Sequence, residues 1–484
     1  MTRNFRFNRL LLPTAMLFAV ATGAPAQTTI LPEPFAGVYA GQPTATPTVC
    51  PTSLPDSNNN SGPTTLLLGN GCLPSQAIIA DVYDVKLDSE GNVYIGEENT
   101  TITLPNSSGG TTSYQSGVDI RVVYNGGTAL YNALVAANPN IPNFNPLPGH
   151  IYTLAGSLTA SISATNSHYY CGGTPTYSAI IGYDALGDGC PAAQSRITPR
   201  GMAIDNDGNV IFANFTSKYG TRVIYVGGTK MYNLIKLLNP SVITPQVGYI
   251  YQLGFGGTTG AEGDGGIATN AAAISPRYVA VDSNENVYMS DGTSTGGTPV
   301  VSASGENVRM INGTTGIVTT VAGETTCGNT TYVAANGCPY GYSGDGGPAT
   351  SALFNYPFAM ALDQYNNLFI SDYTNARIRV LYRGGTLAGI SNPVVGNIYT
   401  YFGGNATSGV QGTLTVDNSP AQNVKLTSPA AINFDKAGNL YVIDNSSHYL
   451  WRVDAITGIA NIVAGGTSST GTAHAGAFCS GFHW

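Results

Sequence analysis

The chain has 484 residues, a formal net charge of −8 and only 10% charged side chains. Binding to nucleic acid is disfavoured, because neutralising phosphates requires clustered lysine and arginine side chains. The hydrophobic content of 42% excludes a wholly disordered chain, because it is enough to build a core.

Residues 1–26 have the pattern of a secretory signal peptide. Three arginines precede the apolar run from Leu10 to Ala21, and Ala24-Pro25-Ala26 is a small-residue cleavage sequence. The apolar run is too short to span a bilayer comfortably. We therefore expect an exported protein, secreted to a periplasm or the exterior, with no transmembrane segment once the signal peptide is removed.

Seven cysteines in an exported chain predict disulfides. Three local pairs are expected, each in the loop before a repeat: Cys50–Cys72, Cys171–Cys190 and Cys327–Cys338. Closing such loops of about 11–23 residues would stabilise the fold by roughly 3 kcal/mol each. Cys479 is left over. The cysteine spacings do not match a zinc site, so no metal is expected.

Five copies of a strand-turn-strand phrase follow, at residues 83–97, 200–214, 277–291, 358–372 and 430–444. The first strand of each copy has the alternating side-chain pattern of a β-strand and ends at an aspartate. A D-x-x-G-N turn then leads into a second strand. The shared aspartates are Asp88, Asp205, Asp282, Asp363 and Asp435. Because Asp and Asn bond to nearby backbone in turns, we expect these residues to build the turns rather than bind cations.

A third strand in each copy carries one arginine, and a fourth strand ends in small residues. The arginines are Arg121, Arg222, Arg309, Arg379 and Arg452. The Asp372–Arg379 and Asp444–Arg452 intervals suit cross-strand pairs, so a structural role is expected for the arginines. Four antiparallel strands per repeat make one blade of a β-propeller, which predicts an all-β fold over residues 81–466.

Two inserts after the third strand, at residues 126–140 and 227–241, break the strand pattern. Their apolar residues recur at helical spacing, and Asn138-Pro139 and Asn239-Pro240 end them. We expect a short amphipathic helix in each, lying on the surface of the ring and burying one stripe. Docking of a partner on these helices is the alternative.

The phrase GDGGPATSALFNYPFAMALDQYNNLFISDYTNARIRVLY at residues 344–382 resembles the NHL-repeat β-propeller family. Residues 263–282 repeat its first half, and the resemblance covers about residues 66–466. It implies an exported NHL-type repeat protein, in which relatives share the scaffold more than the chemistry. The lyases of this family place zinc ligands and an arginine in the central channel, and no matching set is found here.

The number of blades is left open by the sequence. The sequence contains five sets of strands one to three but six candidates for a fourth strand. The additional candidate is Gly37-Val38-Tyr39-Ala40-Gly41, which matches the pattern of the fourth strands. In the family such a strand usually closes the ring, and the tail at residues 467–484 resembles the start of a further blade. We favour a truncated six-bladed design over five closing blades with residues 27–80 packed as an extra edge.

No catalytic residues and no cofactor are predicted. The G-D-G-G phrases lack the lysine of a phosphate loop, and Gly292–Gly296 is a chance match to a nucleophile elbow. We expect a non-catalytic recognition module that binds a protein, peptide or glycan over the face carrying the cysteine loops. The aromatic contacts proposed for that face are Tyr114, Phe215, Tyr219 and Tyr373.

Two alternatives remain at this point. One is a metal-dependent propeller enzyme of lyase or lactone-hydrolase type, with a divalent cation in the channel. The other is a non-functional fragment. The sequence does not indicate the oligomeric state.

Overall fold

The computed structural model describes residues 70–77, 79, 82–97, 100–105, 111–116, 119–156, 188–195, 197–215, 220–257, 263–273, 275–292, 306–324, 341–404 and 417–465. The expected signal peptide, the strand at 37–41, Cys479 and the tail at 467–484 lie outside these ranges. Within them, no helix is long and apolar enough to cross a membrane.

Five antiparallel sheets, each built from four consecutive blade strands, form the described part of the chain. Blade 1 contains β1 (Val82–Leu87), β2 (Val93–Glu97), β5 (Asp119–Tyr124) and β6 (His150–Gly156). Blade 2 contains β7 (Pro199–Ile204), β8 (Val210–Asn214), β9 (Thr221–Ile224) and β10 (Ile250–Gly254). Blade 3 contains β11 (Pro276–Val281), β12 (Val287–Asp291), β13 (Asn307–Ile311) and β14 (Val318–Ala322).

The last two blades follow the same order. Blade 4 contains β15 (Pro357–Leu362), β16 (Leu368–Asp372), β17 (Arg377–Leu381) and β18 (Ile398–Phe402). Blade 5 contains β20 (Pro429–Phe434), β21 (Leu440–Asp444), β22 (Tyr449–Val453) and β23 (Ile459–Gly465), and the short β19 (Ser419–Pro420) pairs with β23. The predicted all-β propeller with five blades is confirmed.

Smaller elements connect the blades. A short 3-10 helix precedes each blade, at Pro74–Gln76, Ala192–Gln194, Ala268–Asn270, Ala349–Ser351 and Ala421–Asn423. A hairpin of β3 (Thr100–Pro105) and β4 (Thr111–Ser116) lies in the link between β2 and β5. This hairpin lies in a link at the end of blade 1 where its innermost strand begins, which we call the loop face.

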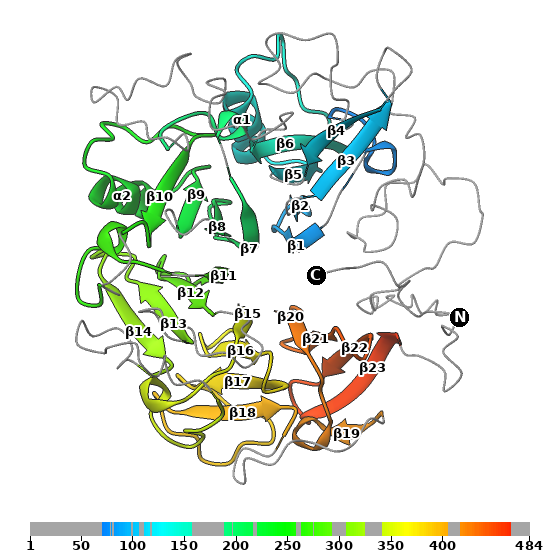
Figure 1. The fold of residues 1–484 in the computed structure, drawn as a ribbon, viewed down its shortest axis with the longest axis vertical. Helices are drawn as coiled ribbons and strands as arrows, with labels where there is room; N and C mark the ends of the chain where they lie inside the picture. The colour runs from blue at the N-terminus through cyan, green and yellow to red at the C-terminus, as the bar shows by residue number, and fades with distance from the viewer. Residues whose placement is uncertain are drawn as a thin grey trace, which may run out of the picture.

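The sheets are arranged around a common centre, with the first strand of each blade innermost (Figure 1). Strand β1 packs against β7, β7 against β11, β11 against β15, and β15 against β20. No comparable contact joins β20 to β1 among the described residues. As far as the described residues go, the ring therefore has an open side between blade 5 and blade 1, where the blue and orange strands of Figure 1 do not meet.

The shared aspartates make the turns that the sequence predicts. In blade 2, Asp205 Oδ1 accepts the backbone N–H groups of Asp207 at 2.9 Å and Asn209 at 2.8 Å, and Asn209 Nδ2 donates to Asp205 Oδ2 at 2.6 Å. Asn209 Oδ1 then accepts the N–H of Val226 at 2.6 Å, which ties the turn to the link after β9. The same aspartate-centred bonds recur in the other four blades, at Asp88, Asp282, Asp363 and Asp435.

The two inserts are helices, as expected. Helix α1 (Thr128–Ala137) buries Leu130, Ala133, Leu134 and Ala137, and α2 (Thr229–Leu238) buries the matching stripe of Met231, Leu234, Ile235 and Leu238. A Cβ at Gly248 would lie 2.5 Å from the carbonyl oxygen of Ala133. Helix α1 therefore packs closely against the loop that leads into β10, and so joins blade 1 to blade 2.

The arginines of blades 1 to 4 are buried, and in blades 2 to 4 their main partners are the aspartates of the G-D-G phrases. The Nη2 atoms of Arg222, Arg309 and Arg379 lie 2.5, 2.8 and 2.7 Å from Oδ1 of Asp188, Asp264 and Asp345. The expected cross-strand pair of Arg379 with Asp372 is also present, at 3.5 Å. Blade 1 has Asn70 in place of the aspartate, 3.4 Å from Arg121 Nη2.

Arg452 does not occupy the position of the other blade arginines, so its predicted equivalence to them is wrong by one residue. In the other blades the buried arginine lies opposite the residue seven positions after the shared aspartate, as Arg379 lies opposite Ile370. In blade 5 that opposite residue, Val442, pairs with Trp451 instead. Arg452 is partly exposed and pairs with Asp454 at 3.3 Å, so the expected pair with Asp444 does not form. The fully buried indole of Trp451 fills the space that a guanidinium takes elsewhere.

Two of the cysteines expected to pair lie within the described residues. Cys72 and Cys190 are buried in the loops before blades 1 and 2. Their expected partners Cys50 and Cys171, and both members of the pair Cys327–Cys338, fall in segments that the structure does not describe. The three pairings therefore stay predictions.

Candidate ligand-binding site

Two of the four aromatic residues proposed for ligand contact can be placed. Phe215 follows β8 and Tyr373 follows β16, so both lie at the end of the blades where the innermost strands begin. The backbone N–H of Phe215 donates to Thr198 O at 2.9 Å, and that of Tyr373 donates to Tyr356 O at 3.2 Å. Tyr219 and the side chain of Tyr114 fall outside the described part of the chain.

The Phe215 ring contacts two arginines of the innermost strands. The guanidinium carbon of Arg200, on β7, is 3.3 Å from the centroid of the Phe215 ring, and that of Arg277, on β11, is 5.3 Å away. Such stacking is attractive because the face of the ring is negative, and it holds a planar guanidinium in a fixed orientation. Phe215 itself is 37% exposed, so the stack reaches the surface.

Tyr373 belongs to a group of rings that adjoins this stack. Its ring meets Tyr356 edge-on at 5.4 Å between centroids, and the guanidinium carbon of Arg277 lies 4.8 Å from the centroid of the Tyr356 ring. Tyr356 has a φ of 63°, which is unusual for a residue with a side chain, and its N–H donates to Glu306 Oε2 at 2.7 Å. The contacts through Arg277 and Tyr356 therefore connect Phe215 with Tyr373.

Aromatic rings fill the centre of the propeller beneath this surface. Tyr83 of blade 1, Tyr278 of blade 3 and Phe358 of blade 4 have ring centroids 5.5–6.0 Å apart. A Cβ at Gly201 of blade 2 would lie 2.2 Å from the Tyr278 ring, so only glycine leaves room for that ring. We call these rings and the arginines above them the axial cluster; its members are Tyr83, Arg200, Phe215, Arg277, Tyr278, Tyr356, Phe358 and Tyr373.

One carboxylate lies beneath the axial cluster. Asp84 on β1 accepts the N–H of Met202 at 2.7 Å and the Nζ proton of Lys86 at 3.1 Å. Burial raises the pKa of Asp84 above its usual range, although the Lys86 charge lowers it. Burial also raises the pKa of the Tyr278 hydroxyl, and the neighbouring Asp84 adds to this effect. Asp84 thus ties blade 1 to blade 2 through the backbone of Met202.

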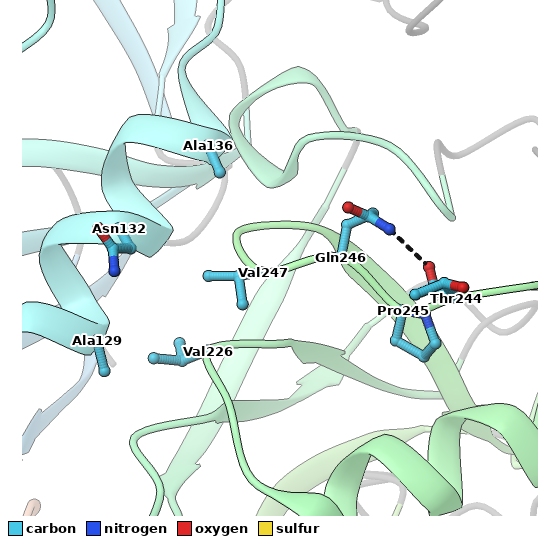
Figure 2. Close-up of a pocket in the computed structure, with 8 residues that line it drawn as sticks. All are labelled: Ala129, Asn132, Ala136, Val226, Thr244, Pro245, Gln246 and Val247. Carbon is cyan, nitrogen blue, oxygen red and sulfur yellow. Dashed lines mark hydrogen bonds between the residues drawn. The ribbon is translucent and has the colours of Figure 1, made fainter.

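A hollow of about 480 Å³ lies outside the ring, between α1 and blade 2 (Figure 2). Ala129, Asn132 and Ala136 of α1 form one wall, and the other wall is formed by Val226 and by residues 244–247. Gln246 Nε2 donates to Thr244 O at 3.0 Å on the rim, as the dashed line in Figure 2 shows. The walls carry small and apolar side chains with few polar groups to orient a ligand.

A second hollow, of about 320 Å³, lies between the aspartate turns of blades 1 and 2. Asp88, Glu90, Asp205 and Asp207 line it, but Asp88 and Asp205 are already occupied by the bonds that make their turns. Across the ranges that the structure describes, no group of three His, Cys, Asp or Glu side chains is placed to hold a metal ion.

No local sequence pattern marks the arginines of the axial cluster. Arg200 and Arg277 each stand five positions before the shared aspartate of their blade, where blades 1 and 4 have Tyr83 and Phe358. This position begins the innermost strand, so its side chains converge on the axis. Four of the five copies carry a large side chain at this position, and this is the signal in the sequence that marks the axis.

Comparison with known proteins adds little to this geometry. No family model and no curated protein matches the chain. Among solved structures, virginiamycin B lyase from Staphylococcus aureus is similar with 9% identity and a TM-score of 0.32, over 82% of this chain and 83% of that chain. A protein assigned as a gluconolactonase is similar with 11% identity and a TM-score of 0.30, over 56% of this chain and 66% of that chain. At these values neither structure supports an argument about the function of this chain.

Proposed function

We propose that this protein is an exported, NHL-type recognition propeller without catalytic activity, which binds a protein, peptide or glycan at the loop face above the axial cluster. The supporting observation is the stack of Arg200, Phe215 and Arg277, which the innermost strands of two blades hold at the surface. Residues on loops supported by a rigid frame are common recognition residues, and arginine and aromatic side chains contribute most to binding at interfaces.

The plugged axis favours binding at this surface over binding within a channel. Because Tyr83, Tyr278 and Phe358 fill the centre, a ligand that approaches from this face meets Phe215 and Tyr373 rather than an open passage. Rigid aromatic side chains bury a large area at a small entropy cost, which suits the binding of sugar rings or peptide side chains.

The proposal is tested by screening the mature protein on glycan and peptide arrays and then measuring the affinity of the variants for the best ligand. Phe215→Ala and Tyr373→Ala should each weaken binding about ten-fold, which corresponds to about 1.4 kcal/mol. The matched control is Tyr365→Ala, because Tyr365 is also an exposed aromatic residue of blade 4 but lies in the turn at the opposite end of β16.

Equal affinities for the Phe215→Ala and Tyr365→Ala variants would contradict the placement of the site. Elemental analysis of the purified protein tests whether it is instead a metal-dependent enzyme. Stoichiometric zinc or calcium in the purified protein, lost together with a lyase or hydrolase activity, would overturn the proposal.

A further inference from the structure

Each innermost strand has one face that packs on the preceding blade, and in blade 1 this face is uncovered. The residue three positions before the shared aspartate shows the difference. Its exposed fraction is 0% for Met202, 1% for Val279, 3% for Met360 and 4% for Ile432, but 43% for Val85. Leu87, two residues further along β1, is 45% exposed. Two large apolar side chains of a core strand therefore face the open side of the ring.

Blade 5 presents the other wall of the open side. Tyr441 and Ile443 on β21 are only half-buried, whereas their counterparts Phe369 and Ser371 in blade 4 are fully buried against blade 5. Val463 on β23 is 37% exposed, and its counterpart Tyr401 is buried. We call the surface formed by Val85, Leu87, Tyr441, Ile443 and Val463 the open wedge.

The two walls of the open wedge are different surfaces. If a second copy of the chain covered them, blade 1 of one copy would meet blade 5 of the next. Such a head-to-tail contact repeats without a twofold axis, and it yields a filament or a larger ring rather than a closed dimer. A segment of the same chain avoids this outcome and binds at a high effective concentration because it is tethered.

The segment that leads into blade 1 is long enough and apolar enough for this role. The described chain begins at Asn70, and Gly71 N donates to Ile151 O on β6 at 2.7 Å, so the point where residues 27–69 join the described chain lies beside blade 1. Residues 27–69 could span far more than the width of a blade, because an extended residue covers about 3.3 Å. They include the strand-like phrase Gly37–Gly41 and the apolar run Leu66-Leu67-Leu68.

We propose that residues 27–69 pack into the open wedge and cover Val85 and Leu87, in place of the blade that would otherwise precede blade 1. The gain comes from removing apolar surface from water on both walls at once. The proposal does not depend on ligand binding at the axial cluster, so the failure of one leaves the other standing.

Hydrogen exchange of the mature full-length protein, read by mass spectrometry, tests the proposal. Peptides from residues 27–69 should exchange at least ten-fold more slowly than an unstructured chain. The double variant Val85→Asp/Leu87→Asp should remove this protection while the strands of blades 2 to 4 keep theirs. Ile243→Asp is the matched control, since Ile243 is an exposed apolar residue far from the open wedge and the substitution should leave residues 27–69 protected.

Photo-crosslinking gives a readout that does not depend on the stability of the variants. A benzophenone side chain at position 87 should crosslink to residues 27–69 of the same chain, and one at position 243 should not. Free exchange of residues 27–69 in the unmodified protein would overturn the proposal. Crosslinks from position 87 to a second copy, accompanied by oligomers in sedimentation, would also overturn it.

Discussion

Glu285 is the residue that departs furthest from the repeat. It occupies the turn position that is glycine in three other blades, with a φ of 61° and a nearly fully buried side chain. The charge of Asp205 in blade 2 acts on the Glu285 carboxyl, and Asp207 and Lys230 are the other charged groups that act on it. Burial, followed by the Asp205 charge, raises the pKa of Glu285 to about 8. The carboxyl pair thus joins blades 2 and 3 most favourably while it holds a proton.

The raised pKa predicts a pH-dependent stability with a definite sign. The folded protein keeps a proton on Glu285 up to about pH 8, whereas the unfolded chain releases it near its ordinary value of 4.5. The free energy of unfolding should therefore fall as pH rises between these values. Glu285→Gly should reduce this fall and add about 1 kcal/mol near neutral pH, because glycine adopts a positive φ without strain. Urea denaturation at pH 5, 7 and 9 measures both effects.

Asn366→Gly is the control for this prediction. Asn366 has a φ of 60° at the same turn position of blade 4, without a carboxyl group there. This substitution should change stability by a similar or smaller amount at all three pH values. If the slope with pH is unchanged in the Glu285→Gly variant, the assignment of the proton to this pair is wrong.

At the scale of the blade, the sequence predicts the path of the chain better than the partners of its side chains. The D-x-x-G-N phrase determines the turn between the first two strands because its aspartate and asparagine bond to local backbone, so these contacts need no knowledge of the fold. The partners of the arginines come from a loop more than 30 residues away, as for Arg379 and Asp345. Residue type alone also selected Arg452 where the pairing register places Trp451. Register depends on which face is buried, and a short strand with adjacent Trp and Arg leaves this open.

The buried ion pairs of blades 2 to 4 should be far more important for stability than the exposed pair of blade 5. Asp345→Asn leaves Arg379 buried without its closest charge partner, so we expect a loss of about 3 kcal/mol in the free energy of unfolding. Asp454→Asn removes the partner of the partly exposed Arg452 and should cost less than about 1 kcal/mol. Chemical denaturation of both variants measures the difference, and similar losses would show that the Arg379 pair contributes little.

At the scale of the whole molecule, the candidate site was only partly visible in the sequence. The placement of Phe215 and Tyr373 after the second strand, on the expected loop face, follows from the direction of the chain alone. Arg200 and Arg277 were overlooked because a residue near the axis contacts blades that are distant in sequence, and no local pattern marks such contacts. The open side of the ring agrees with the count of only five complete strand sets.

The open side predicts that stability is uneven around the ring. Blade 5 has a neighbour on one face only among the described residues, whereas blade 3 is covered on both faces. In repeat proteins each unit is stabilised mainly by its neighbours. When the Val85→Asp/Leu87→Asp substitutions displace residues 27–69 from the open wedge, backbone amides of β21 and β22 should therefore exchange at least ten-fold faster than those of β12 and β13. Native-state hydrogen exchange measures this, and uniform protection across the five sheets would contradict it.

The aromatic rings at the centre of the axial cluster also explain how a ring with an open side keeps its blades in place. Tyr83 of blade 1 reaches across the axis to Phe358 of blade 4, at 5.9 Å between ring centroids, and to Tyr278 of blade 3 at 6.0 Å. These contacts hold blade 1 to blades 3 and 4, which are far from it in the sequence. Contacts across the axis do not require blade 5 to contact blade 1. Packing of aromatic rings at the centre, rather than closure of the ring, would therefore maintain the spacing of these blades.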